Sequence, residues 1–450
     1  MINSIVRRAG VRGIALAAAG LLLTACNVDK VLKVPDPDVS RPTDVSGKAG
    51  LPTLLAAAVG DFQVAFAGTA IGAEGLVNMT GLFTDEFAFT ETFPTRVQVD
   101  KRSIDRNNST MLGIYFNVQA ARQSTFRAES AYKSLAPTDS AYSEALSLEG
   151  YSFVFLAEAY CSGVPITKLD ATGNIVPGQP LTTQQLLDSA INRFTTALTV
   201  ANSSGSSYLA NLARVGQARA LIFKNSSNLA AAAALVANVP ASFEYIVFSS
   251  SNTARQNNGV FELQWLEGRW TQADKEGTNG LPFRTSNDPR TPFADLGLGF
   301  DNARELFASL KYPSRDASTV LASYTEAQLI IAESQLAAGN YATPTTGTLA
   351  ILNALRAADG LAALAPAVGQ PAQLAQLFSE RAFWLFLTAH RVGDMRRLIR
   401  EYGLGSEAVF PTGTYRGRGG GVYGPDVNFP IPIEEANANP NAPACIDRNA

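Results

Sequence analysis

A long apolar helix near the C-terminal end of the sequence places the strongest constraint on the fold. In Pro371–Ala389 the apolar residues recur at helical spacing, and aromatic residues fill the remaining sides. A helix with almost no polar face is expected to run through a core. Arg381 lies in the middle of the apolar stripe. Because a buried guanidinium that loses its partner costs roughly 3–5 kcal/mol, we predict a buried ion pair at Arg381.

The partners of Arg381 are expected on neighbouring helices and in the segment that follows. Glu326 or Glu333, on a predicted helix over Ser318–Ala338, is the expected acid. The apolar helix is followed by a predicted polar turn, His390–Asp394, which contains Arg391 and Asp394. We interpret Arg381, Glu333, Arg391 and Asp394 as an ionic cluster that holds the last helices together, and not as a catalytic site.

The first 25 residues have the pattern of an export signal. Three arginines precede the apolar run Gly13–Leu23, which is too short to span a bilayer. The sequence Leu23-Thr-Ala-Cys26 then resembles the lipobox of bacterial lipoproteins, in which the cysteine becomes the lipidated N-terminus. An ordinary secretory signal is the alternative. We predict a lipoprotein signal peptide over residues 1–25, lipidation of Cys26 and a proline-containing tether over residues 26–52.

Composition limits the remaining possibilities. The chain has a net charge of −3 and no basic block after the signal, which argues against nucleic-acid binding. Apolar residues make up 46% and charged residues 17%, as in folded globular proteins. Cys161 and Cys445 remain once Cys26 is lipidated. In an exported protein this pair could form a disulfide, and two buried free thiols are the alternative.

The mature chain, residues 53–450, is predicted to be a single, mainly α-helical domain. Tetratricopeptide-like helical repeats forming a superhelix are expected over residues 110–239 and 318–400, with short turns between the helices. Residues 240–317 are predicted to be a loop-rich, partly β insertion, with strand-like runs at Phe243–Ser249 and Val260–Leu266. Residues 401–450 are predicted to be irregular. Thr84–Asp100, aromatic and interrupted by a proline, is predicted to be an exposed loop.

The sequence contains little that indicates catalysis. His390 is the only histidine, and no zinc motif, nucleophile elbow or phosphate-binding loop is present. We therefore predict no metal, no cofactor and no enzymatic activity. A surface glycoside hydrolase is the enzymatic alternative, and it would require two carboxylates facing each other across a cleft.

Ligand binding by exposed aromatic residues is better supported. Sugars present apolar faces to aromatic rings and hydroxyl groups to amide and charged side chains. Trp265 is predicted to lie in the core, because it alternates with Phe261 and Leu263. The rings could instead pack the insertion onto the helices. The candidate ligand-binding residues are Trp270, Arg269, Asn279, Arg284, Phe89 and Phe93.

Several segments together resemble the SusD/RagB family of nutrient-uptake lipoproteins. The resemblance covers most of the mature chain, and the order and spacing of the segments make it specific. It rests on Asp288–Pro292, Leu321–Glu333, Leu352–Arg356, Glu380–Arg381, His390–Arg397, Phe429–Ile433 and Asn437–Pro440.

The resemblance implies a function in uptake. Members of this family are lipid-anchored at the bacterial outer membrane, exposed at the cell surface, and cover a TonB-dependent transporter of the SusC type. They capture oligosaccharides, or peptides in the RagB branch. By this resemblance the expected ligand is an oligosaccharide, with a peptide as the alternative, and the expected partner is a SusC-like transporter.

Overall fold

Helices are the main secondary structure of the protein. The computed structural model describes residues 47–72, 74–170, 174–442 and 444–450. The predicted signal peptide, Cys26 and most of the predicted tether lie outside these residues. The helical elements are η1 (Lys48–Gly50), α3 (Leu51–Ala67), α4 (Leu76–Phe83), α5 (Pro94–Asp100), α6 (Ser109–Leu135), α7 (Ser140–Ala159), α8 (Thr183–Ser203), α9 (Ser207–Lys224), η2 (Ser226–Asn228), α10 (Leu229–Val236), α11 (Gly259–Phe261), η3 (Glu262–Leu266), α12 (Tyr324–Ala337), α13 (Thr348–Ala358), α14 (Gln370–Trp384), α15 (Arg391–Arg400), α16 (Ser406–Val409) and α17 (Ile433–Ala438).

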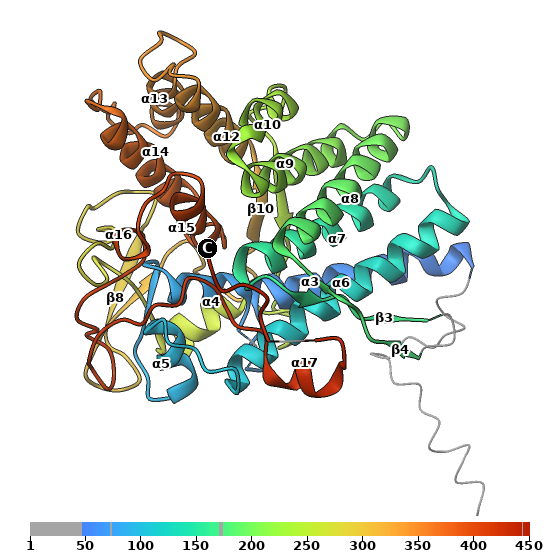
Figure 1. Ribbon diagram of the computed structural model, residues 1–450, viewed down its shortest axis with the longest axis horizontal. Coiled ribbons are helices and arrows are strands. Elements are labelled where there is room, and N and C mark those ends of the chain that lie inside the picture. Colours follow the sequence, from blue (N-terminus) through green and yellow to red (C-terminus); the bar gives the residue numbers. More distant parts are fainter. Residues whose placement is uncertain (1–46, 73, 171–173, 443) are drawn as a thin grey trace, which may run out of the picture. The chain divides into compact units, whose positions relative to one another are not determined.

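Consecutive helices pack side by side within the compact unit Leu51–Ala450. Figure 1 shows the succession from α6 through α7, α8, α9, α10 and α12, and α13 and α14 follow. Polar residues start these helices at the positions where free backbone N–H groups need acceptors. Asn108, Asp139 and Ser206 cap α6, α7 and α9, and Thr182 forms a capping box with Gln185 at α8. The prediction of a mainly helical fold is confirmed.

The strands form small antiparallel pairs and no extended sheet. The pairs are β1 (Phe87–Phe89) with β7 (Trp270–Gln272), β2 (Val164–Pro165) with β5 (Pro180–Leu181), β3 (Lys168–Leu169) with β4 (Ile175–Val176), β6 (Glu244–Val247) with β10 (Thr319–Ser323), and β8 (Phe293–Leu298) with β9 (Glu305–Ser309). Two pairs join strands far apart in sequence. In the first of these, Phe89 lies opposite Trp270.

Four predicted elements are wrong in type or extent. Residues 84–91 are buried and include β1, so this part of Thr84–Asp100 is not an exposed loop, and Pro94 begins α5. Val260–Leu266 is helical and not a strand. The segment Ser318–Ala338 begins with β10, and Ser323 then caps α12. The predicted tether ends too late, because Leu51 already begins α3.

The apolar helix also ends earlier than predicted. Helix α14 stops at Trp384, and α15 begins at Arg391, so His390–Asp394 is not a turn but the entry and first turn of α15. Between them Leu387 and Ala389 have positive φ angles of 54° and 60°. Contacts distant in sequence hold this connection: Leu387 N donates to Glu86 Oε1 at 2.8 Å, and Tyr312 OH donates to Leu387 O at 2.7 Å. Such contacts override the local helical pattern.

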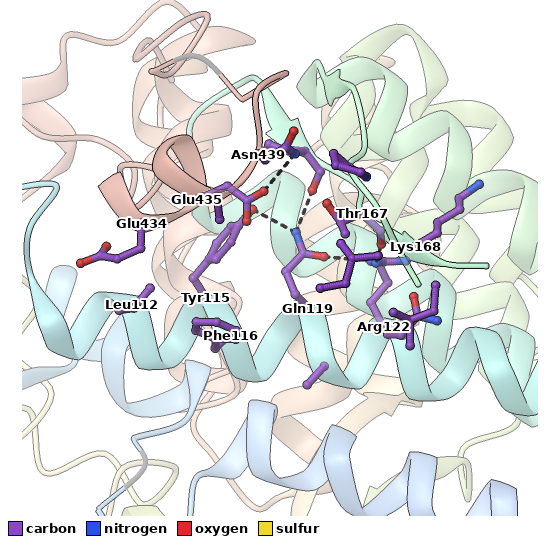
Figure 2. Close-up of a pocket in the computed structure, with 17 residues that line it drawn as sticks. Leu112, Tyr115, Phe116, Gln119, Arg122, Thr167, Lys168, Glu434, Glu435 and Asn439 are labelled. Atoms are coloured by element: carbon purple, nitrogen blue, oxygen red, sulfur yellow. Dashed lines mark hydrogen bonds between the residues drawn. The ribbon is translucent and has the colours of Figure 1, made fainter. Parts of the chain in front are cut away.

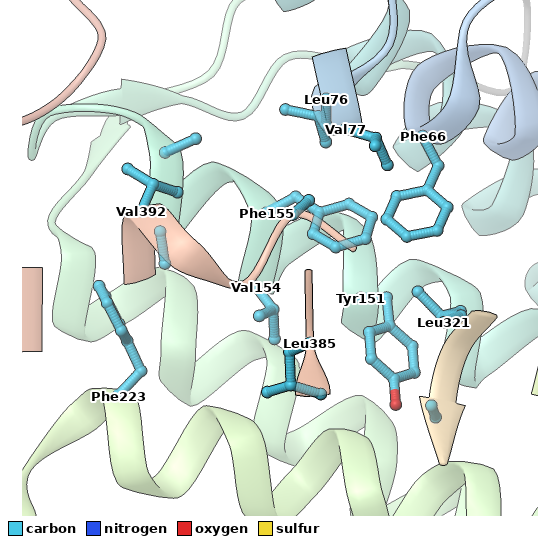
Figure 3. Packing of buried hydrophobic residues seen from close by; sticks show 14 of the residues in the cluster. Phe66, Leu76, Val77, Tyr151, Val154, Phe155, Phe223, Leu321, Leu385 and Val392 are labelled. Carbon is cyan, nitrogen blue, oxygen red and sulfur yellow. The ribbon is translucent and has the colours of Figure 1, made fainter. Parts of the chain in front are cut away.

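The main core joins both ends of this compact unit. Figure 3 shows Phe66 of α3 stacked on Phe155 of α7, with ring centroids 5.2 Å apart, and Val392 of α15 packed in the same cluster. By length and composition, Lys48–Ala67 is apolar enough to cross a membrane. Its second half, however, buries Phe62 and Phe66 in this core. Helix α3 therefore packs as a core helix of the folded unit.

Candidate ligand-binding site

Trp270 does not lie at the surface. It is fully buried in β7, and its ring lies between those of Phe87 and Phe89, with centroids 6.0 and 5.9 Å away in edge-to-face geometry. Phe89 is buried with it. The expectation that these two rings are exposed is wrong, because β1 and β7 pair inside the protein.

Trp265 also differs from the expectation. The segment around it is helical, so Phe261 and Trp265 stand one turn apart and their rings stack with centroids 6.3 Å apart. Trp265 is only partly buried, and its Nε1 donates to Ser309 O at 3.2 Å. Trp265 is therefore less buried than predicted, because the segment is helical and does not have the predicted period of two.

Asn279 and Arg284 each make a contact within the protein. Asn279 Nδ2 donates to Phe410 O at 2.8 Å. The guanidinium of Arg284 lies 3.7 Å from the ring centroid of Phe307. Neither side chain lines the hollow beside Phe93 that is described below, so neither is placed in the candidate site.

Phe93 and Arg269 do come together at the surface. The guanidinium carbon of Arg269 lies 5.5 Å from the ring centroid of Phe93 and 5.1 Å from that of Phe300. The two rings are 44% and 52% exposed, so both can be reached from solvent. Arg96 approaches Phe93 as well, at 4.8 Å. We call Phe93, Arg96, Arg269 and Phe300 the aromatic–arginine cluster.

Carboxylates fix the arginines of the cluster. Arg269 Nη1 lies 3.4 Å from Glu91 Oε1, and its Nε lies 2.8 Å from Glu267 Oε2. Arg96 Nε donates to Glu74 Oε1 at 2.5 Å. Burial raises the pKa of Glu91, although Arg269 and Arg96 oppose this effect. The carboxylates hold the two guanidinium groups against the ring of Phe93.

A hollow of about 520 Å³ lies beside Phe93. Its walls include Phe93 and Arg96 of the cluster, and Thr110, Phe116 and Asn117 of α6. This volume is within the range of small-molecule sites. Exposed rings beside hydroxyl, amide and guanidinium groups are the combination that binds sugar rings: the aromatic faces contact C–H groups and the polar groups bind hydroxyls.

A second hollow, of about 460 Å³, lies on another side of α6. Figure 2 shows it between α6, the β3–β4 hairpin and α17. Phe116, which is 63% exposed, lines both hollows. None of the predicted ligand-binding residues lines this second hollow.

The predicted ionic residues lie in the interior and not at either hollow. Arg381 binds Asp394, and the nearest oxygen of Glu333 lies 3.9 Å from it, so the closest acid is not one of the two predicted ones. Arg391 pairs with Asp85 of the N-terminal part through two hydrogen bonds of 2.7 and 2.8 Å. His390 Nε2 lies 3.1 Å from Glu326 Oε1 and 2.8 Å from Arg219 Nη1.

Cys161 and Cys445 form a disulfide, which was one of the two alternatives predicted for them. Cys161 follows α7 and Cys445 lies in the C-terminal segment, with Cα atoms 5.8 Å apart. Backbone hydrogen bonds run on both sides of it, including Cys161 N to Phe429 O at 2.9 Å. Among the described residues, no group of three or more histidine, cysteine, aspartate and glutamate side chains is arranged to hold a metal ion.

Comparison with known proteins relates the chain to solved structures. No protein-family model matches the sequence, and no curated protein matches it. A SusD superfamily protein from Parabacteroides distasonis superposes with a TM-score of 0.67 at 15% identity, covering 88% of this chain and 98% of the other. The fold is that of the SusD superfamily.

Two further solved structures have names that state what they bind. A SusD-like carbohydrate binding protein from Bacteroides vulgatus matches with a TM-score of 0.57 at 14% identity, over 78% of this chain and 83% of the other. Surface glycan-binding protein A from Bacteroides uniformis matches with a TM-score of 0.61 at 13% identity, over 88% and 98%. At these identities only the fold is shared, and the binding properties belong to the proteins so named.

Sequence reasoning missed Phe300 and Phe116. A helical-wheel count for α6 places Phe116 away from the buried positions Tyr115 and Val118, on the side that also carries the exposed residue Ala120. An aromatic ring on the polar side of an amphipathic helix is a usable signal. Phe300 gave no comparable signal, since its position depends on Phe300 N donating to Gly268 O at 2.8 Å.

Proposed function

We propose that this protein binds oligosaccharides at the aromatic–arginine cluster and the hollow beside it, and catalyses no reaction. The observation that carries the proposal is the placement of Phe93 and Phe300, two exposed rings that flank the fixed guanidinium of Arg269. Exposed rings held beside polar groups reduce the cost of ordering the protein when a sugar stacks on them. The SusD-like fold, shared with proteins named for carbohydrate and glycan binding, supports the same ligand class.

The proposed cellular role is capture for import. The lipobox-like sequence ending at Cys26 supports a lipid anchor at the outer membrane, with the protein exposed at the cell surface. The SusD-like fold supports a SusC-like TonB-dependent transporter as the partner. Affinity isolation of the full chain from a mild detergent extract of its native membrane should recover a large β-barrel protein. Recovery of none, with the chain itself intact, would contradict this role.

A glycan array followed by calorimetry tests the binding site. Phe93→Ala should weaken binding of the best glycan about 10-fold, since loss of one stacking ring corresponds to roughly 1–2 kcal/mol. The matched control is Phe248→Ala, because Phe248 is 72% exposed and lies outside the cluster. If Phe93→Ala binds like the parent protein while both melt at the same temperature, the cluster is not the site.

The purified protein also allows the two alternative functions, peptide capture and glycoside hydrolysis, to be tested. A peptide library screened in parallel tests peptide capture, and binding of peptides alone would replace the proposed ligand class. An assay for newly formed reducing ends tests the glycoside hydrolase. If the purified chain releases sugars and no variant of the glycan site abolishes this release, the reaction takes place elsewhere in the protein.

A further inference from the structure

The charges of the aromatic–arginine cluster are paired within the protein. The guanidinium of Arg96 binds Glu74, with Nε donating to Oε1 at 2.5 Å. The guanidinium of Arg269 lies between two carboxylates, 3.4 Å from Glu91 and 2.8 Å from Glu267. Among these described residues, three carboxylates therefore stand beside two guanidinium groups, and negative charge outweighs positive charge.

The hollow beside Phe93 has no surplus positive charge among its described lining residues. Its charged members are Glu74 and Arg96, which bind each other. The side chain of Glu74 is 5% exposed and that of Arg96 is 16% exposed, so solvent screens their attraction little. A carboxylate or sulfate that enters the hollow would lose part of its water, and the only guanidinium that it meets there is already paired.

The uncharged polar groups of this hollow suit sugar hydroxyls. Thr95 of α5 and Thr110 of α6 line it, and their hydroxyl groups share a hydrogen bond of 2.9 Å. Ser109 and Asn117 of α6 add a hydroxyl and an amide to the lining. Hydroxyl and amide groups can both donate and accept hydrogen bonds, as the hydroxyls of a sugar do.

Helix α6 leaves space for a sugar at Gly113. Thr110, Gly113 and Asn117 lie on one face of α6, because they follow one another at intervals of three and four residues. All three line the hollow, and a Cβ added at Gly113 would meet no atom within 4 Å. A larger side chain at this position would therefore project into the hollow.

We propose that the glycan bound here is neutral, and that the site discriminates against sugars that carry carboxylate or sulfate groups. This inference rests on the proposed function, since it names the class of glycan that the same site takes. Neutral rings stack on Phe93 and Phe300, and their hydroxyls bind the polar groups of the hollow. Acidic sugars approach the carboxylates of Glu74, Glu91 and Glu267, and this like-charge repulsion is what excludes them.

Derivatives of one sugar backbone that differ in charge test the proposal. Each glycan of the array that binds the full chain is compared by calorimetry with its C6 uronate and with the methyl ester of that uronate. The parent glycan and the ester, both neutral, should bind similarly, and the uronate should bind about 10-fold more weakly. Equal or tighter binding of the uronate, or an array whose best glycan is itself acidic, would overturn the proposal. Binding of no array glycan would overturn the proposed function and this inference with it.

Isosteric variants test the role of the carboxylates. Glu74→Gln leaves Arg96 without a counter-charge, so binding of the uronate relative to the neutral parent glycan should strengthen about 5-fold. Glu267→Gln, at a side chain 31% exposed, should act in the same way through Arg269 and replaces Glu74→Gln if that variant lowers the melting temperature. The control Asp359→Asn, at an exposed position outside the cluster, should leave this ratio unchanged. A ratio that neither glutamine variant alters would overturn the proposal.

A steric variant locates the glycan and separates the two possible failures. Gly113→Leu should weaken the parent glycan and the ester about 10-fold by filling the hollow. It should not lower the melting temperature, because leucine has the higher helix propensity and its Cβ meets open space. If Phe93→Ala and Gly113→Leu both bind the parent glycan unchanged, the proposed site is wrong. If both variants lose binding but the unaltered protein binds the uronate and the parent glycan equally, only the preference for neutral glycans is overturned.

Discussion

Arg381 and Asp394 form a buried two-point ion pair between α14 and α15. Arg381 Nε and Nη2 donate to Asp394 Oδ2 and Oδ1 at 2.8 and 2.9 Å. Arg397 contacts Asp394 at 3.3 Å and also binds Glu333 of α12, whose Oε1 accepts from Tyr402 OH at 2.6 Å. The positive charges of two guanidinium groups thus balance the negative charges of two carboxylates in the interior. Burial raises the pKa of Asp394, but Arg381 and Arg397 outweigh it and hold that pKa below its usual value.

Removing Arg381 should destabilise the protein without changing its ligand preference. Arg381→Ala leaves the buried charge of Asp394 partly unpaired, so we expect the free energy of unfolding to fall by about 3–5 kcal/mol. Denaturant melts measure the loss, and the glycan profile of the remaining folded protein should match the parent. Arg127→Ala, at an exposed position on α6, is the control and should have little effect. An unaltered melt for Arg381→Ala would show that this ion pair does not stabilise the fold.

Two helical glycines should respond oppositely to alanine. At Gly216 in α9 an added Cβ would lie 2.3 Å from a ring carbon of Phe194, whereas at Gly113 in α6 it would meet no atom within 4 Å. Gly216→Ala should destabilise the protein by about 1–3 kcal/mol through overpacking. Gly113→Ala should stabilise it by about 0.5–1 kcal/mol, because alanine has the higher helix propensity. Thermal melts of the two variants measure these changes. Equal shifts of the melting temperature with the same sign would show that the α8–α9 contact is looser than described.

Glu86 should make stability decrease with rising pH. Burial raises the pKa of Glu86 from 4.5 to about 8, against smaller opposing effects that include the hydrogen bond from Leu387 N. The native state therefore holds a proton that the unfolded state releases, so this contribution to stability is complete below about pH 4.5 and is lost as pH rises towards 8.

Glu86→Gln keeps the acceptor and removes the titration. The variant and the parent should be similarly stable near pH 4.5, and by pH 8 the variant should be more stable than the parent by on the order of 4 kcal/mol. Denaturant melts across this range measure the difference. Parallel pH profiles for the two proteins would show that Glu86 titrates normally.

The disulfide should stabilise the C-terminal segment against unfolding. Cys161 and Cys445 are 284 residues apart in sequence, so the bond closes a long loop in the unfolded chain. Replacing both cysteines by alanine should lower the free energy of unfolding by about 2–5 kcal/mol. A reducing agent should shift the parent protein to the same midpoint and leave the double variant unchanged. A parent melt that does not respond to reductant would show that the bond is absent in solution.

The long helices could be predicted from the sequence because the patterns that specify them are local. The long helices α6 to α9 carry apolar residues at helical spacing and start at Asn108, Asp139, Thr182 and Ser206, each of which acts within three residues of its own position. The presence of a buried partner for Arg381 followed from the cost of burying a charge. Its identity did not follow, because Asp394 and Glu333 become neighbours only through the turn at Leu387 and Ala389.

The candidate site was accessible only in part. Phe93 and Arg269 were expected from residue type, but their contact with each other and with Phe300 joins α5, β7 and the β8–β9 hairpin. Trp270 is aromatic like Phe93, but it is buried, because its pairing with Phe89 places it inside the protein.

By itself, the sequence determined the helix-rich composition of the chain, the start of most long helices, the need for a buried counter-ion at Arg381 and the export-type leader pattern. Each of these depends on interactions within a few residues or on the free energy of burying a single group. The tertiary structure alone decided where the apolar helix ends, which aromatic rings are exposed and which acid pairs with Arg381. These outcomes depend on contacts such as that between Glu86 and Leu387, 301 residues apart, whose geometry no local pattern encodes.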